Sequence, residues 1–286
     1  MPGSRGLLSS FEPPLHTSGM LRCGDQVGWE MRLRGKDIGV LAAEISEWIR
    51  EQVESAGAEG VVVGMSGGLD SSVTAVLCKR AFPDATLGLI MPCESEHEDI
   101  EHARLVAAKY EIETKEIDLS PVFALLLRTL EPPPRAYSPK DIAIANLKPR
   151  LRMLTLYYFA NKLNYLVVGT GNKSELMVGY FTKYGDGAAD ILPLGDLYKT
   201  EVRRLAEFLG IPDEILRKKP SAGLWRGQTD ESEIGMSYDE LDKILKAIES
   251  WNFTNCDMEE VERVRKMVER AKHKRERPPV FSVNSP

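Results

Sequence analysis

Apolar residues follow two different patterns along this chain. Between residues 38 and 56 they return every three or four positions, as on one face of a helix, at Val40, Leu41, Ile45, Trp48, Ile49 and Val53. Short apolar or alternating segments predict strands in GVVVGM (60–65), ATLGLIM (85–91), ETKEIDL (113–119) and YLVVGT (165–170). The chain is therefore predicted to contain both helices and strands.

Helices are predicted between and after these strands, at Ser71–Phe82, Glu96–Tyr110, a short stretch after Pro121, Asp141–Leu163 and Lys199–Leu209. Pro149 is expected to kink or split the helix over Asp141–Leu163. Strands that alternate with helices predict an α/β fold, a doubly wound parallel sheet with helices on both faces. Residues 215–235 are predicted to be a long loop, followed by two polar helices as C-terminal helical additions.

Domain organisation is simple in this reading. Residues 1–35 are rich in glycine, serine and proline and show no clear period, so we expect an irregular N-terminal arm there. Residues 36–286 are expected to form a single domain. Only about 60 residues precede the glycine-rich segment described below, so no glutaminase domain is expected.

Composition and charge exclude several classes of protein. The 286 residues carry a net charge of -6, so no overall basic field favours nucleic acid as a partner. No apolar run approaches the roughly 20 residues of a membrane span, so no membrane association is expected. Cys23, Cys78, Cys93 and Cys256 lack the paired spacing of zinc or redox sites, and we expect reduced thiols in a cytoplasmic protein.

The segment GMSGGLDSS, residues 64–72, lies between a predicted strand and a predicted helix. In doubly wound folds this position gathers anions, because backbone amides and a helix N-terminus meet there. The segment lacks the Gly-Lys-Ser/Thr ending of the commonest phosphate loop and also the spaced glycines of a dinucleotide fold. Asp70 suits a phosphate loop if a metal bridges carboxylate and phosphate; otherwise it would be a helix N-cap.

The motif SGGxDS in this segment resembles the phosphate loop of the pyrophosphatase-type superfamily. Its members hold the β- and γ-phosphates of ATP and transfer AMP. They include GMP synthetase, asparagine and argininosuccinate synthetases, tRNA-thiolating enzymes and NAD synthetase, and the loop alone does not choose among them.

Segments in the second half narrow the choice, because they resemble the NAD synthetase family closely: NLKPRLRM (146–153), VVGTGNKSE (167–175), GYFTKYGDGAADILPLGDLYKT (179–200), KKPSAGLWRGQTDESEIGMSYDELDKIL (218–245) and KHKRERPP (272–279). The resemblance runs from about Lys36 to Pro279. It implies an adenine nucleotide alpha hydrolase-like fold and a homodimer whose deamido-NAD site is shared between subunits. The implied reaction is the ATP-dependent amidation of deamido-NAD to NAD by ammonia, through an acyl adenylate, with release of AMP and diphosphate.

The resemblance also assigns residues to ATP and magnesium. ATP is implied to contact Gly64, Met65, Ser66, Gly67, Gly68, Leu69, Asp70, Ser71, Thr170, Lys199 and Ser221, where the family often has threonine at the last position. Asp70 and Glu175 are implied to bind Mg²⁺, with ATP as co-substrate, and Asp70, Lys183 and Lys199 are the implied catalytic residues. Without the resemblance, Glu175 reads as the partner of Asn172 in a capping box, and Lys199 as a solvated residue at a helix start.

Deamido-NAD is implied to contact a second group of residues, Arg150, Lys183, Asp190, His273 and Lys274. From the sequence alone each of these reads equally well as an ordinary surface charge. The basic tail would otherwise indicate a solvated helix end or, weakly, nucleic acid.

Two further features carry separate expectations. His97 and His102 lie among carboxylates in SEHEDIEH, but a spacing of five places them on different faces of a helix, so a metal site is not expected; Ser95 and Glu98 instead fit a capping box. The loops around Pro133 and Trp225 are long enough to be lids that order on ligand binding.

Two other functions fit parts of the sequence. Another adenylating enzyme, GMP-synthetase-like or tRNA-thiolating, would share the phosphate loop. A tRNA-thiolating enzyme would require a reactive cysteine pair and a basic surface for RNA, and the sequence shows neither. A nucleotide-binding sensor without turnover would bind ATP but release no diphosphate.

Overall fold

The computed structural model describes residues 32–131, 138 and 140–283. Its centre is a parallel sheet in the order β5-β4-β3-β6, formed by Glu113–Glu116, Thr86–Ile90, Gly60–Gly64 and Tyr165–Val168. In the register of the sheet, Val62 on β3 lies opposite Leu87 on β4 and Val167 on β6. All four predicted strands are confirmed, and their carboxyl ends meet at one edge of the sheet.

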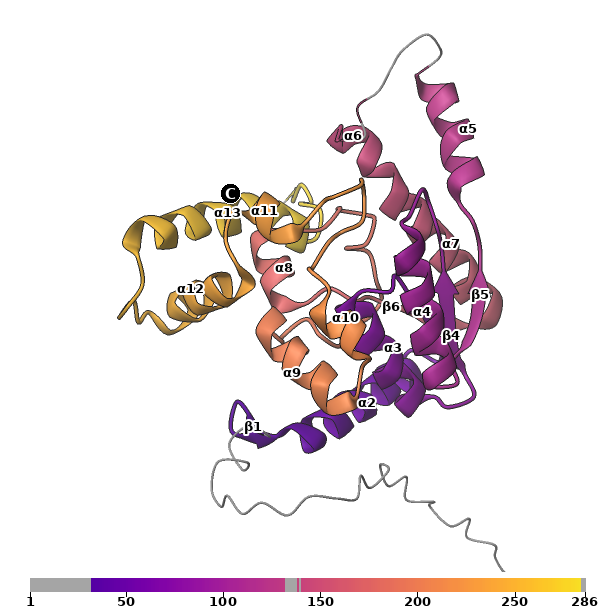
Figure 1. Cartoon of the computed structure of the whole chain (residues 1–286), viewed down its shortest axis with the longest axis horizontal. Coiled ribbons are helices and arrows are strands. Elements are labelled where there is room, and N and C mark those ends of the chain that lie inside the picture. The colour runs from indigo at the N-terminus through magenta and orange to yellow at the C-terminus, as the bar shows by residue number, and fades with distance from the viewer. Residues whose placement is uncertain (1–31, 132–137, 139, 284–286) are drawn as a thin grey trace, which may run out of the picture.

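Helices cover both faces of the sheet, as predicted (Figure 1). Because side chains alternate along a strand, Val61 and Val63 point to one face and Val62 to the other. The first face packs against α2 (Ile38–Ser55), α3 (Leu69–Ala81), α4 (His97–Lys109) and α9 (Lys199–Leu209). The second packs against α5 (Ser120–Leu130), α6 (Ile142–Ala145) and α7 (Leu147–Leu163).

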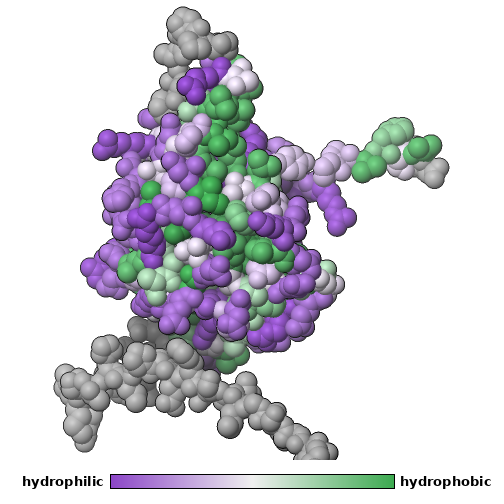
Figure 2. All heavy atoms as spheres, turned by 90° about the vertical axis from the view of Figure 1, so that its right-hand side faces the viewer, coloured by the Kyte–Doolittle hydropathy of each residue, from purple (hydrophilic) through white to green (hydrophobic). Residues whose placement is uncertain are grey.

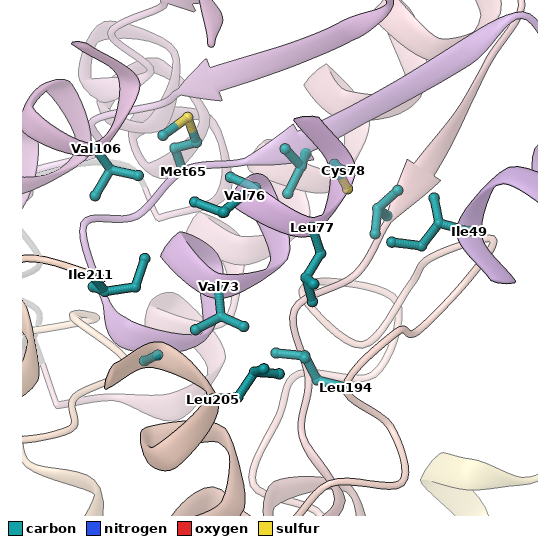
Figure 3. Close-up of a cluster of buried hydrophobic side chains, with 14 of the residues drawn as sticks. Ile49, Met65, Val73, Val76, Leu77, Cys78, Val106, Leu194, Leu205 and Ile211 are labelled. Carbon is teal, nitrogen blue, oxygen red and sulfur yellow. The ribbon is translucent and has the colours of Figure 1, made fainter. Parts of the chain in front are cut away.

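The larger core lies on the first face and fixes how α3 leaves the phosphate loop. Val73 and Leu77 of α3 point toward Leu194 and Leu205, while Val76 lies toward Met65 and Val106 (Figure 3). Each of these seven side chains is at most 4% exposed. Burial of this kind contributes about 1.5–3 kcal/mol per large aliphatic side chain, so α3 is held firmly below the loop that precedes it.

The C-terminal part of the chain forms a separate small core beside the sheet. It is built by α8 (Lys173–Val178), α12 (Tyr238–Ser250) and α13 (Met258–Arg275). The two polar helices expected after residue 235 are thereby confirmed. The long loop predicted over 215–235 is only partly correct, since its ends belong to the short helices α10 (Asp213–Arg217) and α11 (Asp230–Ile234).

The helix predicted over Asp141–Leu163 is indeed split, but the break is at Asn146 and not at Pro149. Pro149 falls in the first turn of α7, where a proline ring is tolerated because no backbone N–H is needed there. The last residues of the predicted N-terminal arm are ordered as well. Arg32–Leu33 (β1) pairs with Lys36–Asp37 (β2), and Asp37 then caps α2; residues 1–31 of the predicted arm lie outside the described residues.

Among the described residues, none of the helices is both long and apolar enough to cross a membrane. Cys78, Cys93 and Cys256 are free thiols, while Cys23 lies outside the described residues.

Candidate active site

The glycine-rich segment forms the turn between β3 and α3, at the carboxyl edge of the sheet. The side chain of Ser71 folds back into this turn, where its Oγ lies 2.9 Å from Oγ of Ser66 and donates to the carbonyl of Gly68 at 3.0 Å. The helix begins at Leu69 with Gly68 as its N-cap, and no side chain caps it. Backbone N–H groups at this N-terminus are therefore available to an anion.

Gly67 shows why the turn needs glycine. Its φ of +76° lies in the left-handed region, and a Cβ added there would lie 2.0 Å from the carbonyl oxygen of Asp99. The phosphate loop is thus packed directly against the beginning of α4. Any side chain at this position would push the two apart.

Asp70 lies in the first turn of α3 and is not the N-cap of that helix, which was the alternative interpretation. Its Oδ1 accepts a hydrogen bond from Nδ2 of Asn172 at 3.0 Å, and its Oδ2 accepts one from Nζ of Lys199. The phosphate loop is therefore tied to the segment that follows β6 and to the start of α9.

Glu175 serves two purposes in the structure. The capping box that was the alternative interpretation of Glu175 is present: Oδ1 of Asn172 accepts from the backbone N–H of Glu175 at 3.0 Å, and Oε2 of Glu175 accepts from the backbone N–H of Asn172 at 3.4 Å. The other carboxylate oxygen, Oε1, accepts from Nζ of Lys199 at 3.1 Å. The capping interaction orients the carboxylate toward the lysine rather than competing with it.

Lys199 is the first residue of α9, and its side chain is only 8% exposed. Its backbone N–H donates to Oγ of Ser174 at 2.9 Å, and its ammonium lies 5.1 Å from the centre of the Tyr238 ring. Burial lowers the pKa of Lys199, but the nearby carboxylates of Asp70 and Glu175 raise it by more. The pKa of Lys199 is therefore above its ordinary value. The side chain is a permanent cation between two acids.

Two residues of this cluster were missed by the sequence reasoning, Asp230 at the start of α11 and Tyr238 at the start of α12. The Tyr238 hydroxyl lies 3.1 Å from Oδ2 of Asp230 and 3.4 Å from Oε1 of Glu175. Burial raises the pKa of Glu175 to about 7, Lys199 opposes this, and the negative charges of Asp70 and Asp230 add to it. Three acidic side chains thus lie around one ammonium group. Their negative charge exceeds the single positive charge of Lys199, so the cluster favours the binding of a further cation.

The donor set fits a magnesium ion. Oxygen atoms of Asp70 and Glu175 converge on a single cation, the ammonium of Lys199, and oxygens are the ligands that Mg²⁺ prefers. Two carboxylates are few for a cage made of protein alone, and none of the described residues form a group of three or more metal-ligating side chains. Mg²⁺ typically binds through one or two carboxylates together with substrate phosphates, which is what this arrangement offers beside the phosphate loop.

Thr170 and Ser221 belong to two different segments of the chain. Thr170 follows β6, next to β3 in the sheet. Ser221 lies in the exposed loop between α10 and α11, where its Oγ accepts from the backbone N–H of Gly223 at 3.1 Å. Lys218, at the start of this loop, donates to Asp99, so the loop containing Trp225 is attached beside the phosphate loop. Its ordering on ligand binding stays a prediction, and Pro133 lies outside the described residues.

Four of the five residues assigned to deamido-NAD gather at the end of α13. Nζ of Lys183 donates to the carbonyl of His273 at 2.5 Å, and Arg150 donates to the carbonyl of Lys183 at 3.4 Å. Lys274 donates to the backbone carbonyls of Gly179 and Phe181, in the loop that follows α8. Burial lowers the pKa of Lys274 against the opposing charge of Asp186.

Asp190 lies apart from that group. Its Oδ2 accepts from the backbone N–H of Val167 at 2.7 Å and its Oδ1 from the hydroxyl of Tyr157 at 3.2 Å. The carboxylate therefore accepts from a backbone N–H on the edge strand β6, and it is also exposed to solvent.

The histidine pair does not form a site. The side chain of His97 is 83% exposed and His102 is buried, so the two lie on different faces of α4, as predicted. The capping box predicted for Ser95 and Glu98 is wrong. The N-cap of α4 is Glu96, and Oγ of Ser95 accepts hydrogen bonds from the backbone of Cys93 and from Arg152 instead. Contacts from a distant helix outweigh the local motif here.

Comparison with known proteins gives a consistent result. A family model described as NAD synthase matches residues 41–278. The NH(3)-dependent NAD(+) synthetase of Archaeoglobus fulgidus is 52% identical over 242 residues, which cover 84% of this chain and 95% of that protein.

Solved structures agree. The NMN synthetase of Francisella tularensis superposes with a TM-score of 0.78 and 35% identity, covering 87% of this chain and 100% of that one. The NH3-dependent NAD synthetase of Campylobacter jejuni gives a TM-score of 0.73 and 29% identity, covering 86% and 100%.

Proposed function

This chain belongs to the NAD synthase family, and from that premise we propose that it is a ligase that amidates deamido-NAD to NAD with ammonia and ATP, releasing AMP and diphosphate. One observation carries the proposal: Asp70, Glu175 and Lys199 converge beside the glycine-rich turn, at the edge where a doubly wound sheet binds its ligands. The alternative adenylating enzymes, GMP-synthetase-like or tRNA-thiolating, have the same glycine-rich turn but belong to other families.

The chemistry explains why so few reactive side chains are present. A carboxylate is a poor electrophile, so the nicotinate carboxylate of deamido-NAD first attacks the α-phosphorus of ATP and diphosphate leaves. Ammonia then attacks the carbonyl carbon of the acyl adenylate, and AMP leaves. Neither step needs a covalent bond to the enzyme, so positioning and neutralisation of charge supply the rate.

We assign the phosphates of ATP to residues 64–71, with Lys199 as a cation and Thr170 and Ser221 as further contacts of ATP. Asp70 and Glu175 would hold Mg²⁺, which when bound neutralises phosphate charge and polarises the phosphoryl group. Lys199 would then no longer bridge the two carboxylates, and Asp230, whose charge already acts on the lysine, would be a nearby acid for it.

We assign the dinucleotide to the surface formed by Arg150, Lys183, His273 and Lys274, with Asp190 at the end of β6. The contacts among the first four support a single binding surface, because α7, residues 179–183 and α13 are joined there. Basic groups suit the diphosphate and ribose groups of the ligand.

A homodimer is the assembly we propose, with a second copy of this chain on the face that carries α5 and α7. Hydrophobic side chains form a band on this face (Figure 2), and they include Val122, Leu125, Leu130, Ile142, Leu154 and Tyr158, all at least 50% exposed. A band this continuous is unusual on the surface of a monomer. The same helix α7 carries Arg150, which supports a substrate site shared between the two subunits. We place the reaction in the cytoplasm, a proposal supported by the free thiols at Cys78, Cys93 and Cys256.

Product analysis tests the function. Purified protein is incubated with Mg²⁺, ATP and deamido-NAD, once with ammonium and once with glutamine. We expect NAD and AMP in equal amounts with ammonium and none with glutamine. A parallel reaction replaces deamido-NAD by nicotinate mononucleotide, because one structural neighbour is an NMN synthetase; faster turnover of the mononucleotide would move the assignment to that substrate. ATP binding without release of diphosphate would instead indicate a sensor.

A further inference from the structure

Arg152 on α7 has no assigned role, and its environment is unusual. Its Nε donates to the carbonyl of Met91 at 3.2 Å and its NH2 group donates to Oγ of Ser95 at 3.2 Å. Both acceptors are neutral, and among the described residues no carboxylate forms an ion pair with this guanidinium. Since a guanidinium has five N–H groups, the others remain available to a ligand.

Asp99 and Asp186 act on Arg152 electrostatically, but neither carboxylate pairs with it directly. Asp99 accepts from Lys218, and Asp186 accepts from the backbone N–H of Thr182 at 2.9 Å. Burial lowers the pKa of Arg152 more than Cys93, Asp186 and Asp99 together raise it. The side chain is only partly exposed, so it is a largely desolvated cation that is not directly paired with an acid in the part of the chain that the structure describes. Such a cation binds an anion more strongly than one in water does.

Its location connects the two halves of the proposed site. Met91 follows β4, and a Cβ added to Gly64 at the start of the phosphate loop would lie 3.5 Å from Cε of Met91. On the other side, the segment 182–187 packs on α7, where the hydroxyl of Thr182 donates to Oδ1 of Asn146 at 2.6 Å and Gly185 lies against Pro149. Arg152 therefore lies between the loop assigned to the phosphates and the segment assigned to deamido-NAD.

We propose that Arg152 is a further catalytic residue, which binds the anionic reaction centre where the carboxylate of deamido-NAD meets the α-phosphate of ATP. The proposal rests on the function proposed above. In the first step, a carboxylate oxygen forms a bond to the α-phosphorus, the bond from that phosphorus to the bridging oxygen breaks, and diphosphate leaves with the electron pair. Negative charge on the equatorial oxygens must be balanced there, and a planar guanidinium can donate to two of them at once.

A purely structural role is the competing explanation, because the two existing hydrogen bonds hold the end of β4 and the following loop against α7. The two roles differ in what a substitution changes. A structural arginine supports stability and affects all steps through misfolding. An arginine at the reaction centre affects the adenylation rate in a protein that remains folded.

The experiment compares Arg152→Ala and Arg152→Lys with Arg104→Ala, which removes an exposed guanidinium from α4 that pairs with Glu101 and Glu116. Adenylation is followed as exchange of labelled diphosphate into ATP, which requires deamido-NAD but no ammonia. We expect both Arg152 variants to lose at least about 100-fold in the exchange rate, with the KM for ATP changed by less than about threefold. Guanidinium ion added to Arg152→Ala is expected to restore part of the rate, and it should not stimulate Arg104→Ala.

Melting temperatures and circular dichroism establish that the variants are folded. If Arg152→Ala does not fold, the exchange rate of Arg152→Lys, which keeps the charge and most of the volume, is used instead. Exchange within about twofold of the wild type in a folded variant would overturn the proposal, as would a loss that follows the drop in melting temperature without rescue. Wild-type protein that makes no NAD at all would instead reject the proposed function, so the two failures are distinguishable.

Discussion

Nζ of Lys199 lies 3.1 Å from Oε1 of Glu175, and the same ammonium also donates to Asp70. The lysine comes from the start of α9 and the glutamate from α8, while the aspartate comes from the first turn of α3, directly after the phosphate loop. One cation therefore closes the contact between the phosphate loop and the C-terminal part of the chain, at the position where we place magnesium and the phosphates of ATP.

Replacing this cation gives the first prediction. Lys199→Met leaves Asp70, Glu175 and Asp230 close together without their ammonium, so we expect a loss of about 3 kcal/mol in the free energy of unfolding and loss of activity. Saturating Mg²⁺ should restore part of the stability in this variant and have a smaller effect on the wild type, because the ion replaces the missing charge. Urea denaturation with and without Mg²⁺ measures both. Lys266→Met, an exposed lysine on α13, is the control; equal Mg²⁺ responses in all three proteins would contradict the assignment of the metal site.

The second prediction concerns the turn itself. Gly67 and Gly57 both have positive φ, but an added Cβ meets the carbonyl of Asp99 only at Gly67. Gly57→Ala is therefore expected to cost about 1 kcal/mol from backbone strain alone, with unchanged kinetics. Gly67→Ala should in addition raise the KM for ATP by at least about tenfold, since the phosphate loop must move away from α4. Steady-state kinetics of the matched pair decide; the same KM in both variants would show that the loop does not hold ATP.

Acid stability provides a third prediction. Nζ of Lys173 pairs with Asp196 at 2.9 Å and with Glu249 at 2.8 Å. Burial raises the pKa of both carboxyls, but hydrogen bonds, from Lys173 above all, lower it more, so both pKa values lie below their ordinary 3.8 and 4.5. Because the folded pKa is depressed, this stabilisation is present above the ordinary values and is lost as the pH falls through the folded ones.

The measurement follows from that sign. Lys173→Met is expected to be less than about 1 kcal/mol less stable than the wild type at pH 7, a modest amount because both carboxylates are exposed to solvent. The difference should shrink below about pH 4 as the carboxyls become protonated. Urea midpoints at several pH values test this, and a difference that stays constant from pH 7 to pH 3 would contradict the ionic origin.

The apolar face gives the fourth prediction. Leu125 on α5 is 60% exposed, and Leu125→Glu places a charge in the centre of the proposed contact between two copies. We expect the wild type to have the mass of a dimer in light scattering, and the variant that of a monomer with reduced activity. Met258→Glu, also an exposed apolar residue but at the start of α13 and outside the band, should remain dimeric. An unchanged mass for Leu125→Glu would place the interface elsewhere.

Several parts of this structure were predictable because their causes are local. The helix over 38–55 has a continuous apolar stripe, and the four strands are short apolar or alternating segments, so these elements were found to within one to three residues. The capping box at Asn172 and Glu175 was also found, because both partners belong to the same helical turn.

Failures occurred where a distant segment competes with the local pattern. Ser95 has the spacing of a helix cap, yet its hydroxyl accepts a hydrogen bond from Arg152 of α7 instead. Pro149 indicated a break in its helix, but the break came at Asn146 and left the proline in a first turn where it costs little.

The sequence by itself determined the alternation of strands and helices, the position of the phosphate loop, and through its motifs the family. Only the tertiary structure decided that Asp230 and Tyr238 join Asp70 and Glu175 around Lys199, and that Arg152 lies between the two binding segments. The physical reason is separation along the chain. Helix and strand patterns arise from neighbours a few residues apart, whereas these contacts form only when the ends of several strands meet at one edge of the sheet.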